Sequence, residues 1–243
     1  MSQPTISIII PVFNAKRTIE SALRSVWNQS LRAHEIIVID GGSNDGTVDL
    51  IKNFQASITH WISERDSGVY DAINKGILKA TGDWIYILGS DDRLASNDVL
   101  ETITPHLTTS NTLVFGSVRN VNIKQSMVPE VHISSMGAGI YVRNTLHQQS
   151  AFYRRSLFAN QPFDSSLKVL ADYDFHLHLL LDSQRGQQVD LVIAECEASG
   201  LSKQFTRSLY QEEFRLKRKR LGLLRALLLA PIIFGKFVLK QLR

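Results

Sequence analysis

Cysteine is almost absent from this chain of 243 residues, which holds only Cys196. One cysteine cannot form an internal disulfide, and no second ligand stands beside it at zinc-site spacing, so the sequence argues against a disulfide framework and a structural zinc. The segment Met1–Thr5 carries no basic residue, and Pro11 and Asn14 break the apolar run behind it, which does not match a secretory signal. We therefore expect a protein of the cytoplasm.

A net positive charge is absent from the chain outside its C-terminal region. Residues 203–243 hold eleven Lys or Arg against two Glu, a net charge of +9, so the first 202 residues carry −5 within the total of +4. A nucleic-acid binder more often spreads its cationic residues over a face of the folded domain, so a nucleic-acid partner is not expected. We predict one domain over residues 1–205 and a basic amphipathic tail over residues 206–243.

The tail lacks an apolar run long enough to cross a bilayer. Its longest uncharged stretch, Ala226–Gly235, has ten residues, about half of the roughly 20 that a spanning helix needs. Cationic residues beside leucine-rich segments suit an anionic lipid surface, so we expect peripheral attachment to the inner face of the cell membrane. A terminal helix packed on the domain or on another subunit is the alternative.

What the chain does contain is an alternation of short β-branched runs and segments of helical period. This order predicts an α/β fold with a mostly parallel sheet flanked by helices, because continuous apolar strands suit a sheet covered on both faces. The strands are expected over Thr5–Phe13, Glu35–Asp40, Ile58–Ser63 and Asp83–Leu88, and the helices over Ala15–Asn28 and Val69–Ala80.

The second half of the chain has a less regular pattern. It predicts a hairpin, a glycine-containing loop, a helix, a late strand and a long basic helix that Pro231 interrupts. These elements are expected over Leu113–Asn122 with Gln125–Val131, Ser134–Leu146, Asp172–Leu181, Val189–Ala194 and Leu209–Leu229.

Polar residues follow three of the expected strands. They are Pro11–Asn14, the sequence DGGSNDGT at Asp40–Thr47, and GSDD at Gly89–Asp92, and in a parallel sheet such ends converge on one edge. The small DGGSNDGT turn lets a nucleotide approach the backbone, although a simple turn with a helix cap has the same composition. The carboxylates of Asp91 and Asp92 suit Mg²⁺ or Mn²⁺, with a solvated acidic turn as the alternative.

Several segments in one order make a more specific pattern than any single motif. SIIIPVFNA, EIIVIDGGSNDGT, SERDSGVYDAINKGILKATGDWIYIL and GSDD, within Ile6–Asp92, resemble the nucleotide-binding half of family 2 glycosyltransferases, which have the GT-A fold. LHQQSAFYRRSLF (Leu146–Phe158), VLADYDFHLHL (Val169–Leu179) and SGLS (Ser199–Ser202) resemble the acceptor-side half. The resemblance covers roughly the first 200 residues and extends to bacterial surface-polysaccharide transferases of the colanic-acid type.

The resemblance implies a nucleoside-diphosphate sugar donor of the UDP, GDP or dTDP type and a divalent metal, Mn²⁺ or Mg²⁺. It implies Asp92 as the metal ligand, with Asp91 second, and Asp40 as the leading nucleotide contact. Asn74 and Lys75 have a plain alternative as exposed residues of the helix Val69–Ala80. The full set implied for the nucleotide sugar is Pro11, Asn14, Asp40, Asp45, Asp66, Asn74, Lys75 and Asp91.

On the acceptor side, the resemblance implies Asp172 as the catalytic base of an inverting displacement and a lipid-linked glycan as the acceptor. Asp174 is the alternative base, and a helix cap is the structural alternative for Asp172. His147 and Gln148 are implied near the acceptor and diphosphate, although a lone histidine is more often a packing residue.

Two glycines depart from the family pattern, which often has aspartate at the positions of Gly41 and Gly89. This leaves a non-catalytic nucleotide-binding or scaffold member as the rival hypothesis. A dinucleotide-dependent oxidoreductase is disfavoured because PVFNAK, after the first strand, contains no glycine fingerprint. An EF-hand at DGGSNDGT is excluded because Gly42 and Ile51 would occupy its positions 3 and 12.

Overall fold

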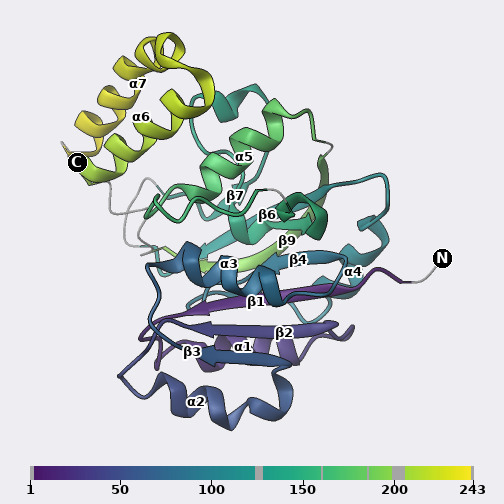
Figure 1. Ribbon diagram of the computed structural model, residues 1–243. Coiled ribbons are helices and arrows are strands. Elements are labelled where there is room, and N and C mark those ends of the chain that lie inside the picture. Colours follow the sequence, from purple (N-terminus) through teal and green to yellow (C-terminus); the bar gives the residue numbers. More distant parts are fainter. Residues whose placement is uncertain (1–2, 124–127, 160, 185, 199–205, 242–243) are drawn as a thin grey trace.

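A computed structural model describes residues 3–123, 128–159, 161–184, 186–198 and 206–241. Within them the chain forms one mixed sheet with the strand order β3-β2-β1-β4-β8-β6-β9-β5, and β7 pairs with β6 (Figure 1). The first four of these strands are parallel, β8 is antiparallel to both neighbours, and β9 is parallel to β6. The strands are β1 (Ile6–Val12), β2 (Glu35–Asp40), β3 (His60–Ser63), β4 (Trp84–Ile87), β5 (Arg93–Leu94), β6 (Leu113–Val121), β7 (Val131–Ile133), β8 (Ala151–Arg154) and β9 (Gly186–Glu197).

Helices cover both faces of the sheet. One apolar core lies under α1, α2 and α4, which contribute Ile19, Ile51 and Val99, and the other lies under α3 and α5, which contribute Ile73 and Phe175. Because both faces are covered, β1, β2 and β4 are buried along their length, whereas the edge strand β3 is partly exposed. The helices are α1 (Ile19–Trp27), α2 (Thr47–Asn53), α3 (Val69–Lys79), α4 (Val99–Ile103) and α5 (Ala171–Leu181), with 3₁₀ turns at Gln55–Ser57, Thr104–His106, Ala138–Tyr141, Gln148–Ser150 and Arg155–Phe158.

The register of the parallel strands brings their carboxyl ends to one edge. Val12 of β1 pairs with Asp40 of β2, and Ile9 pairs with Ile87 of β4. The loops that follow these strands therefore start side by side, which confirms the expected convergence of the polar segments.

A helical hairpin closes the chain. Helix α6 (Arg207–Leu221) packs beside α5, and α7 (Leu223–Gln241) folds back along α6, at the end of the molecule opposite α2 (Figure 1). The expected break at Pro231 is wrong, because Pro231 lies inside α7 and the chain turns at Gly222, which has φ 85°. Glycine adopts this positive φ without a steric penalty, so it ends α6. No helix within the described residues is long and apolar enough to cross a membrane.

Most other expected elements agree with the structure. The apolar face of α1 consists of Ile19, Ala22, Leu23 and Val26, as its period predicts. The hairpin partner of β6 begins only at Val131, and residues 124–127 lie outside the described part. Strand β8 was not expected, because the short apolar run AFYR shows no alternation, and β9 extends well beyond the predicted Val189–Ala194.

Candidate active site

The turn after β2 is organised by Asp40. Its Oδ2 accepts the backbone N–H groups of Gly42 and Ser43 at 3.1 and 3.0 Å and the hydroxyl of Ser63 at 2.6 Å, and its Oδ1 accepts the Ser43 hydroxyl. The carboxylate is fully buried, so a charge in this position requires such a set of donors. Asp40 therefore shapes the turn on which a nucleotide would rest.

Asn14 and Asp45 join the turn to the end of β1. The Asn14 side chain accepts the Asn44 N–H at 3.1 Å, and its own backbone has φ 49°, a conformation that asparagine tolerates. Asp45 accepts the Lys16 N–H at 3.1 Å and the Thr47 N–H at 3.0 Å. Its pKa is lowered chiefly by the hydrogen bond from the Thr47 hydroxyl. These contacts fix the loop. Pro11 is a buried residue of β1, just before the loop begins.

The space over Gly41 is filled by the carboxylate of Asp66. A Cβ added to Gly41 would lie 2.4 Å from Oδ2 of Asp66, so a side chain and the present Asp66 conformation exclude each other. The other oxygen of Asp66 accepts the Gly68 N–H at 2.9 Å. The glycine thus lets a carboxylate from the next loop take the place that an aspartate at position 41 would occupy.

Gly89 has the same relationship to the acidic pair after β4. A Cβ at this position would lie 2.4 Å from Oδ2 of Asp92 and 3.0 Å from Oδ1 of Asp91. Asp92 is turned inward, where Gln149 donates to its Oδ2 at 2.9 Å and the Glu197 N–H donates to its Oδ1 at 3.0 Å. Asp91 is exposed and has no hydrogen bond or ion pair within the described residues. The open carboxylate of the pair is therefore Asp91.

Asp172 is the second residue of α5 and receives side-chain donors on both oxygens. Asn144 donates to Oδ2 at 2.9 Å, and the hydroxyl of Tyr70 lies 3.1 Å from Oδ1 and 2.8 Å from the carbonyl oxygen of Val169. Burial raises the pKa of Asp172 to about 6, although the hydrogen bonds oppose this shift. The group is then ionised at neutral pH and more basic than an ordinary carboxylate.

A buried chain of side chains orients Asn144. Because its amide nitrogen donates to Asp172, its oxygen accepts from Nδ1 of His176 at 3.3 Å, and Nε2 of that ring accepts from the Tyr153 hydroxyl at 2.7 Å. Burial lowers the pKa of His176 to about 3, so the ring stays neutral and makes both contacts at physiological pH. This network was not predicted, because its members lie on three separate segments.

Asp174 is bound by the C-terminal hairpin. Arg220 of α6 donates to both of its carboxylate oxygens, at 2.8 and 2.5 Å, and only 1% of Asp174 is exposed. A carboxylate fully used by a buried bidentate pair has no oxygen left for a substrate proton. The geometry therefore favours Asp172 over Asp174 as the base.

The segment from Asn144 to Gln149 connects the two carboxylate centres, since its first residue binds Asp172 and its last binds Asp92. His147 lies between them, with its ring 5.8 Å from that of His132. Gln148 starts the adjacent 3₁₀ turn, and its buried Nε2 has no hydrogen-bond partner within the described residues. The structure thus brings His147 and Gln148 into the same region as the two centres.

The side chains of Asn74 and Lys75, both on α3, bind other groups of the protein. Asn74 exchanges two hydrogen bonds with the backbone of Phe163, at 2.8 and 3.0 Å, and so fastens α3 to the acceptor half. Lys75 pairs with Glu64 at 2.8 Å, and this hydrogen bond is the main reason why its pKa is raised. Both side chains are therefore engaged with protein groups.

Two chains of contacts join the nucleotide half to the acceptor half. On one side Lys168 donates to the Ser67 carbonyl at 2.8 Å, next to the pair formed by Tyr70 and Asp172. On the other side Gln149 and Asn144 connect Asp92 to Asp172. The motifs SERDSGVYDA and LHQQS contain Tyr70 and Gln149, and these could have been singled out as polar groups within otherwise expected segments.

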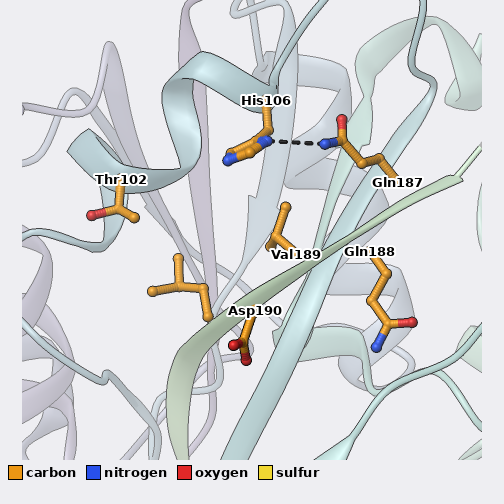
Figure 2. A pocket seen from close by; sticks show the side chains of 7 residues that line it. Thr102, His106, Gln187, Gln188, Val189 and Asp190 are labelled. Carbon is orange, nitrogen blue, oxygen red and sulfur yellow. Dashed lines mark hydrogen bonds between the residues drawn. The ribbon is translucent and has the colours of Figure 1, made fainter.

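A cavity of about 260 Å³ lies apart from this region, between α4 and β9 (Figure 2). In it Gln187 donates to Nδ1 of His106 at 2.9 Å, and the remaining walls come from Thr102 and residues 188–191. None of the side chains expected to bind nucleotide, metal or acceptor lines this cavity, so it is not assigned to the reaction.

Sequence comparison places the chain in a family. The profile of glycosyl transferase family 2 matches residues 7–161. The chain belongs to this family. A glycosyltransferase of PGL/p-HBAD biosynthesis from Mycobacterium bovis is 34% identical over 185 residues, covering 73% of this chain and 70% of that protein. This chain is accordingly a glycosyltransferase.

Solved structures share the fold of this family 2 glycosyltransferase. The S. aureus TarS fragment 1–349 in complex with UDP-GlcNAc aligns with a TM-score of 0.67 at 19% identity, covering 87% of this chain and 65% of that one. The chain spans 39% of a longer TarS structure. The mannosyltransferase PcManGT from Pyrobaculum calidifontis, in complex with GDP-Man and Mn²⁺, aligns at 0.64 and 16% identity over 97% of this chain and 70% of its own. These likenesses confirm the predicted GT-A fold.

The acidic side chains that follow β4 would suit a metal ion that takes its remaining ligands from water and from the substrate. Among the residues that the structure describes, no cluster of three or more His, Cys, Asp or Glu side chains has metal-site geometry. Mg²⁺ and Mn²⁺ in nucleotide sites often take one or two carboxylates and complete their shell with water and phosphate oxygens. Asp91 offers the open carboxylate for this arrangement, while the oxygens of Asp92 already accept hydrogen bonds from Gln149 and the Glu197 backbone.

Proposed function

We propose that this glycosyltransferase inverts the configuration of the transferred sugar, with Asp172 as the base. The Asp172 carboxylate takes the proton of the acceptor hydroxyl while that oxygen forms a bond to the anomeric carbon. The bond from this carbon to the diphosphate oxygen breaks, and its electrons leave with the nucleoside diphosphate. The observation that supports this role most directly is geometric: Asn144 and Tyr70 orient the Asp172 carboxylate, whereas Arg220 binds both oxygens of Asp174. The pKa of Asp172, which burial raises to about 6, agrees with a base working near neutral pH.

The donor in this proposal is a nucleoside-diphosphate sugar of the UDP, GDP or dTDP type. It rests on the turn after β2, which Asp40, Asn14 and Asp45 hold in place, with Asp66 beside Gly41. The relatives with the same fold were solved with UDP-GlcNAc or GDP-Man, which supports a donor of this class. Asn74 and Lys75 support the site by fixing helix α3.

A divalent cation, Mn²⁺ or Mg²⁺, belongs to the same proposal. When bound, it would neutralise the charge that develops on the departing diphosphate. We assign Asp91 as its main protein ligand, because that carboxylate is exposed whereas Asp92 is held inward by Gln149. His147 and Gln148 lie on the same bridging segment, where they would face the diphosphate or acceptor.

The proposed acceptor is a lipid-linked glycan of bacterial surface-polysaccharide assembly, at the inner face of the cell membrane. A broad face of α7 supports the membrane location, since Leu224 and Leu228 are 78% and 75% exposed and Leu223, Leu227, Ile232 and Phe234 extend the same apolar surface. Apolar side chains this exposed are costly in water and stable in a lipid interface.

The cationic residues of the tail contribute less to this attachment than the sequence predicts. Lys217 is fully buried and bonded to Glu213, while Lys219 and Arg220 pair with Asp164 and Asp174. Lys219 and Arg220 attach α6 to the domain through these carboxylates, and Lys217 does so by donating to the Val142 carbonyl at 2.9 Å.

The first experiment follows the anomeric configuration of the product by NMR, together with turnover of wild type and Asp172→Asn. An inverted product and a loss of at least about a hundredfold in kcat support the proposal. Retained nucleotide binding without turnover in the wild type would instead favour the rival hypothesis of a non-catalytic member. Retention of configuration would refute the assignment of Asp172 as the base.

The membrane part is tested separately by sedimentation with anionic vesicles. The double variant Leu224→Gln, Leu228→Gln should lose binding, because it removes two of the most exposed leucines of α7. Leu78→Gln on α3 is the matched control, since Leu78 is 85% exposed on the body and should leave binding unchanged. Equal sedimentation of all three proteins would refute the attachment.

A further inference from the structure

The cations of the C-terminal hairpin fall into two groups. Lys217, Lys219, Arg220 and Lys236 bind carboxylates of the protein at 2.7, 2.6, 2.5 and 2.6 Å. Arg207, Arg215, Arg218 and Arg225 are exposed and have no ion pair within the described residues; of these, Arg207 and Arg215 line a groove. The second group therefore keeps its full charge for a partner outside the hairpin.

Arg207 and Arg215 border this groove, which lies between α6 and α7. The groove has a volume of about 640 Å³, and Gln211 adds one uncharged polar group to its rim. Its remaining lining is apolar or aromatic: Tyr210, Phe214, Ala230, Ile233, Phe234 and Phe237. Tyr210 and Phe237 meet edge to face, with ring centroids 5.5 Å apart, across the two helices. The result is an apolar trough with guanidinium groups beside it.

The trough is continuous with the exposed surface of α7. Phe234 lines it and is 66% exposed, whereas its neighbour Ile233 is 5% exposed and forms part of its floor. A molecule held in the groove would therefore also touch the face of α7 that carries Leu227 and Leu228. Among the described residues that line the groove, none belongs to the candidate active site.

We infer that the groove binds one anionic phospholipid, with an acyl chain along the aromatic trough and the phosphodiester on Arg207 and Arg215. Guanidinium groups bind phosphate oxygens through charge-assisted, paired hydrogen bonds. The volume lies within the range of pockets that enclose drug-sized ligands, which leaves room for one acyl chain and not for a whole long-chain phospholipid. The inference rests on the proposed membrane attachment and extends it. One lipid molecule would bind at a defined site, in addition to the contact between the apolar face of α7 and the bilayer.

The test uses dihexanoyl phosphatidylglycerol as monomers, below its critical micelle concentration, with binding measured by titration calorimetry. Ala230→Trp should abolish saturable binding by filling the trough, and Arg207→Gln with Arg215→Gln should weaken it at least about tenfold. Arg218→Gln is the matched control, because Arg218 is exposed on the same helix and does not line the groove. Glycerol phosphate should bind at least about tenfold more weakly because it has no acyl chain for the trough. Dihexanoyl phosphatidylcholine keeps the phosphodiester, but its choline cation cancels the net negative charge beside the two arginines, so it should also bind more weakly.

Failure of this inference is distinguishable from failure of the proposed function. The Ala230→Trp protein should keep its nucleotide-dependent rise in melting temperature, which shows that the fold and the donor site are intact. No saturable lipid binding by the wild type, or unchanged binding by Ala230→Trp in an intact protein, would overturn the lipid site. A concentration-dependent dimer that Ala230→Trp dissociates would also overturn it, because the occupant would then be a second copy of the chain.

Discussion

Glu212 on α6 binds the backbone of Leu170 at the start of α5: Oε1 of Glu212 accepts the Leu170 N–H at 2.6 Å. The same carboxylate accepts the N–H groups of Val169 and Lys168 at 2.8 and 2.9 Å. Leu170 occupies the N-cap position of α5, and Glu212 binds its N–H together with those of the two residues that precede it. The segment ahead of Asp172 is therefore fixed from α6.

Replacing Glu212 with Gln should lower kcat by about tenfold and leave the KM for the donor nearly unchanged. The variant loses the negative charge that three backbone donors share, which should also lower the free energy of unfolding by about 1–3 kcal/mol. Steady-state kinetics and chemical denaturation measure the two effects.

Glu213→Gln is the control for this prediction. Glu213 lies on the same helix and pairs with Lys217 and Lys236, without contact to the segment before Asp172. It should lose stability and keep kcat at a temperature where the variant is folded. An equal loss of kcat in both variants would mean that Glu212 acts only through general stability.

Asn144→Ala should move the acid limb of the pH–rate profile upward. The Asn144 amide donates to the ionised form of Asp172, so it lowers the pKa of that carboxyl from the higher value that burial alone would give. Without it the pKa rises above about 6, and a larger fraction of the enzyme is protonated and inactive at neutral pH. A profile of kcat/KM against pH measures the shift, and an unmoved acid limb would show that Asn144 does not tune the base.

The parallel half of the fold could be predicted because its strands are short apolar runs that end in glycine- and aspartate-rich turns. The contacts around Asp172 could not, since Tyr70, Asn144 and Glu212 come from segments far apart in sequence, and only their packing brings them together. A helix period indicates which face is buried, but it does not show which distant polar group that face will meet.

The C-terminal region illustrates the same limit. Its basic composition predicts a membrane-facing tail, whereas in the structure several of its cations form ion pairs with carboxylates of the protein, such as Asp174. Charge counts along a sequence carry no information about which partner is nearby after folding. The turn at Gly222 instead of Pro231 shows that local propensities give candidates for a break, while the packing of α7 against α6 selects one.

Asp172→Asn should stabilise the protein above pH 6 while it abolishes turnover. The pKa of Asp172 is raised in the folded protein from about 3.8 to about 6, so the protonated carboxyl favours the folded state. This contribution is complete below about pH 4 and is lost as the pH rises through 6. The neutral Asn should therefore gain up to about 3 kcal/mol at pH 7–8 and almost nothing at pH 4. Denaturation at both pH values measures it, and a destabilised variant at pH 8 would contradict the burial of this charge.

Gly41→Ala should weaken nucleotide binding by about tenfold or more. The added methyl group would lie 2.4 Å from Oδ2 of Asp66, which forces that side chain to move, although the backbone of Gly41 itself needs no positive φ. Overpacking of this kind typically costs about 1–3 kcal/mol. In the Asp66→Ala background the same substitution should cost much less, because its steric partner is gone. Additive losses in the double variant would show that the two residues do not interact.

Asp91→Asn and Asp92→Asn should have different effects. Asp91 is exposed and open to a cation, so its variant should lose the extra rise in melting temperature that Mn²⁺ adds to nucleotide, while the protein alone melts as before. Asp92 accepts hydrogen bonds from Gln149 and the Glu197 backbone, so its variant should melt lower even without ligand. The measurement is a melting series with UDP, GDP and dTDP, each with and without Mn²⁺. If Asp92→Asn alone removed the Mn²⁺ effect at unchanged stability, Asp92 would turn outward to become the metal ligand, since its inward hydrogen bonds would then contribute nothing to the folded state.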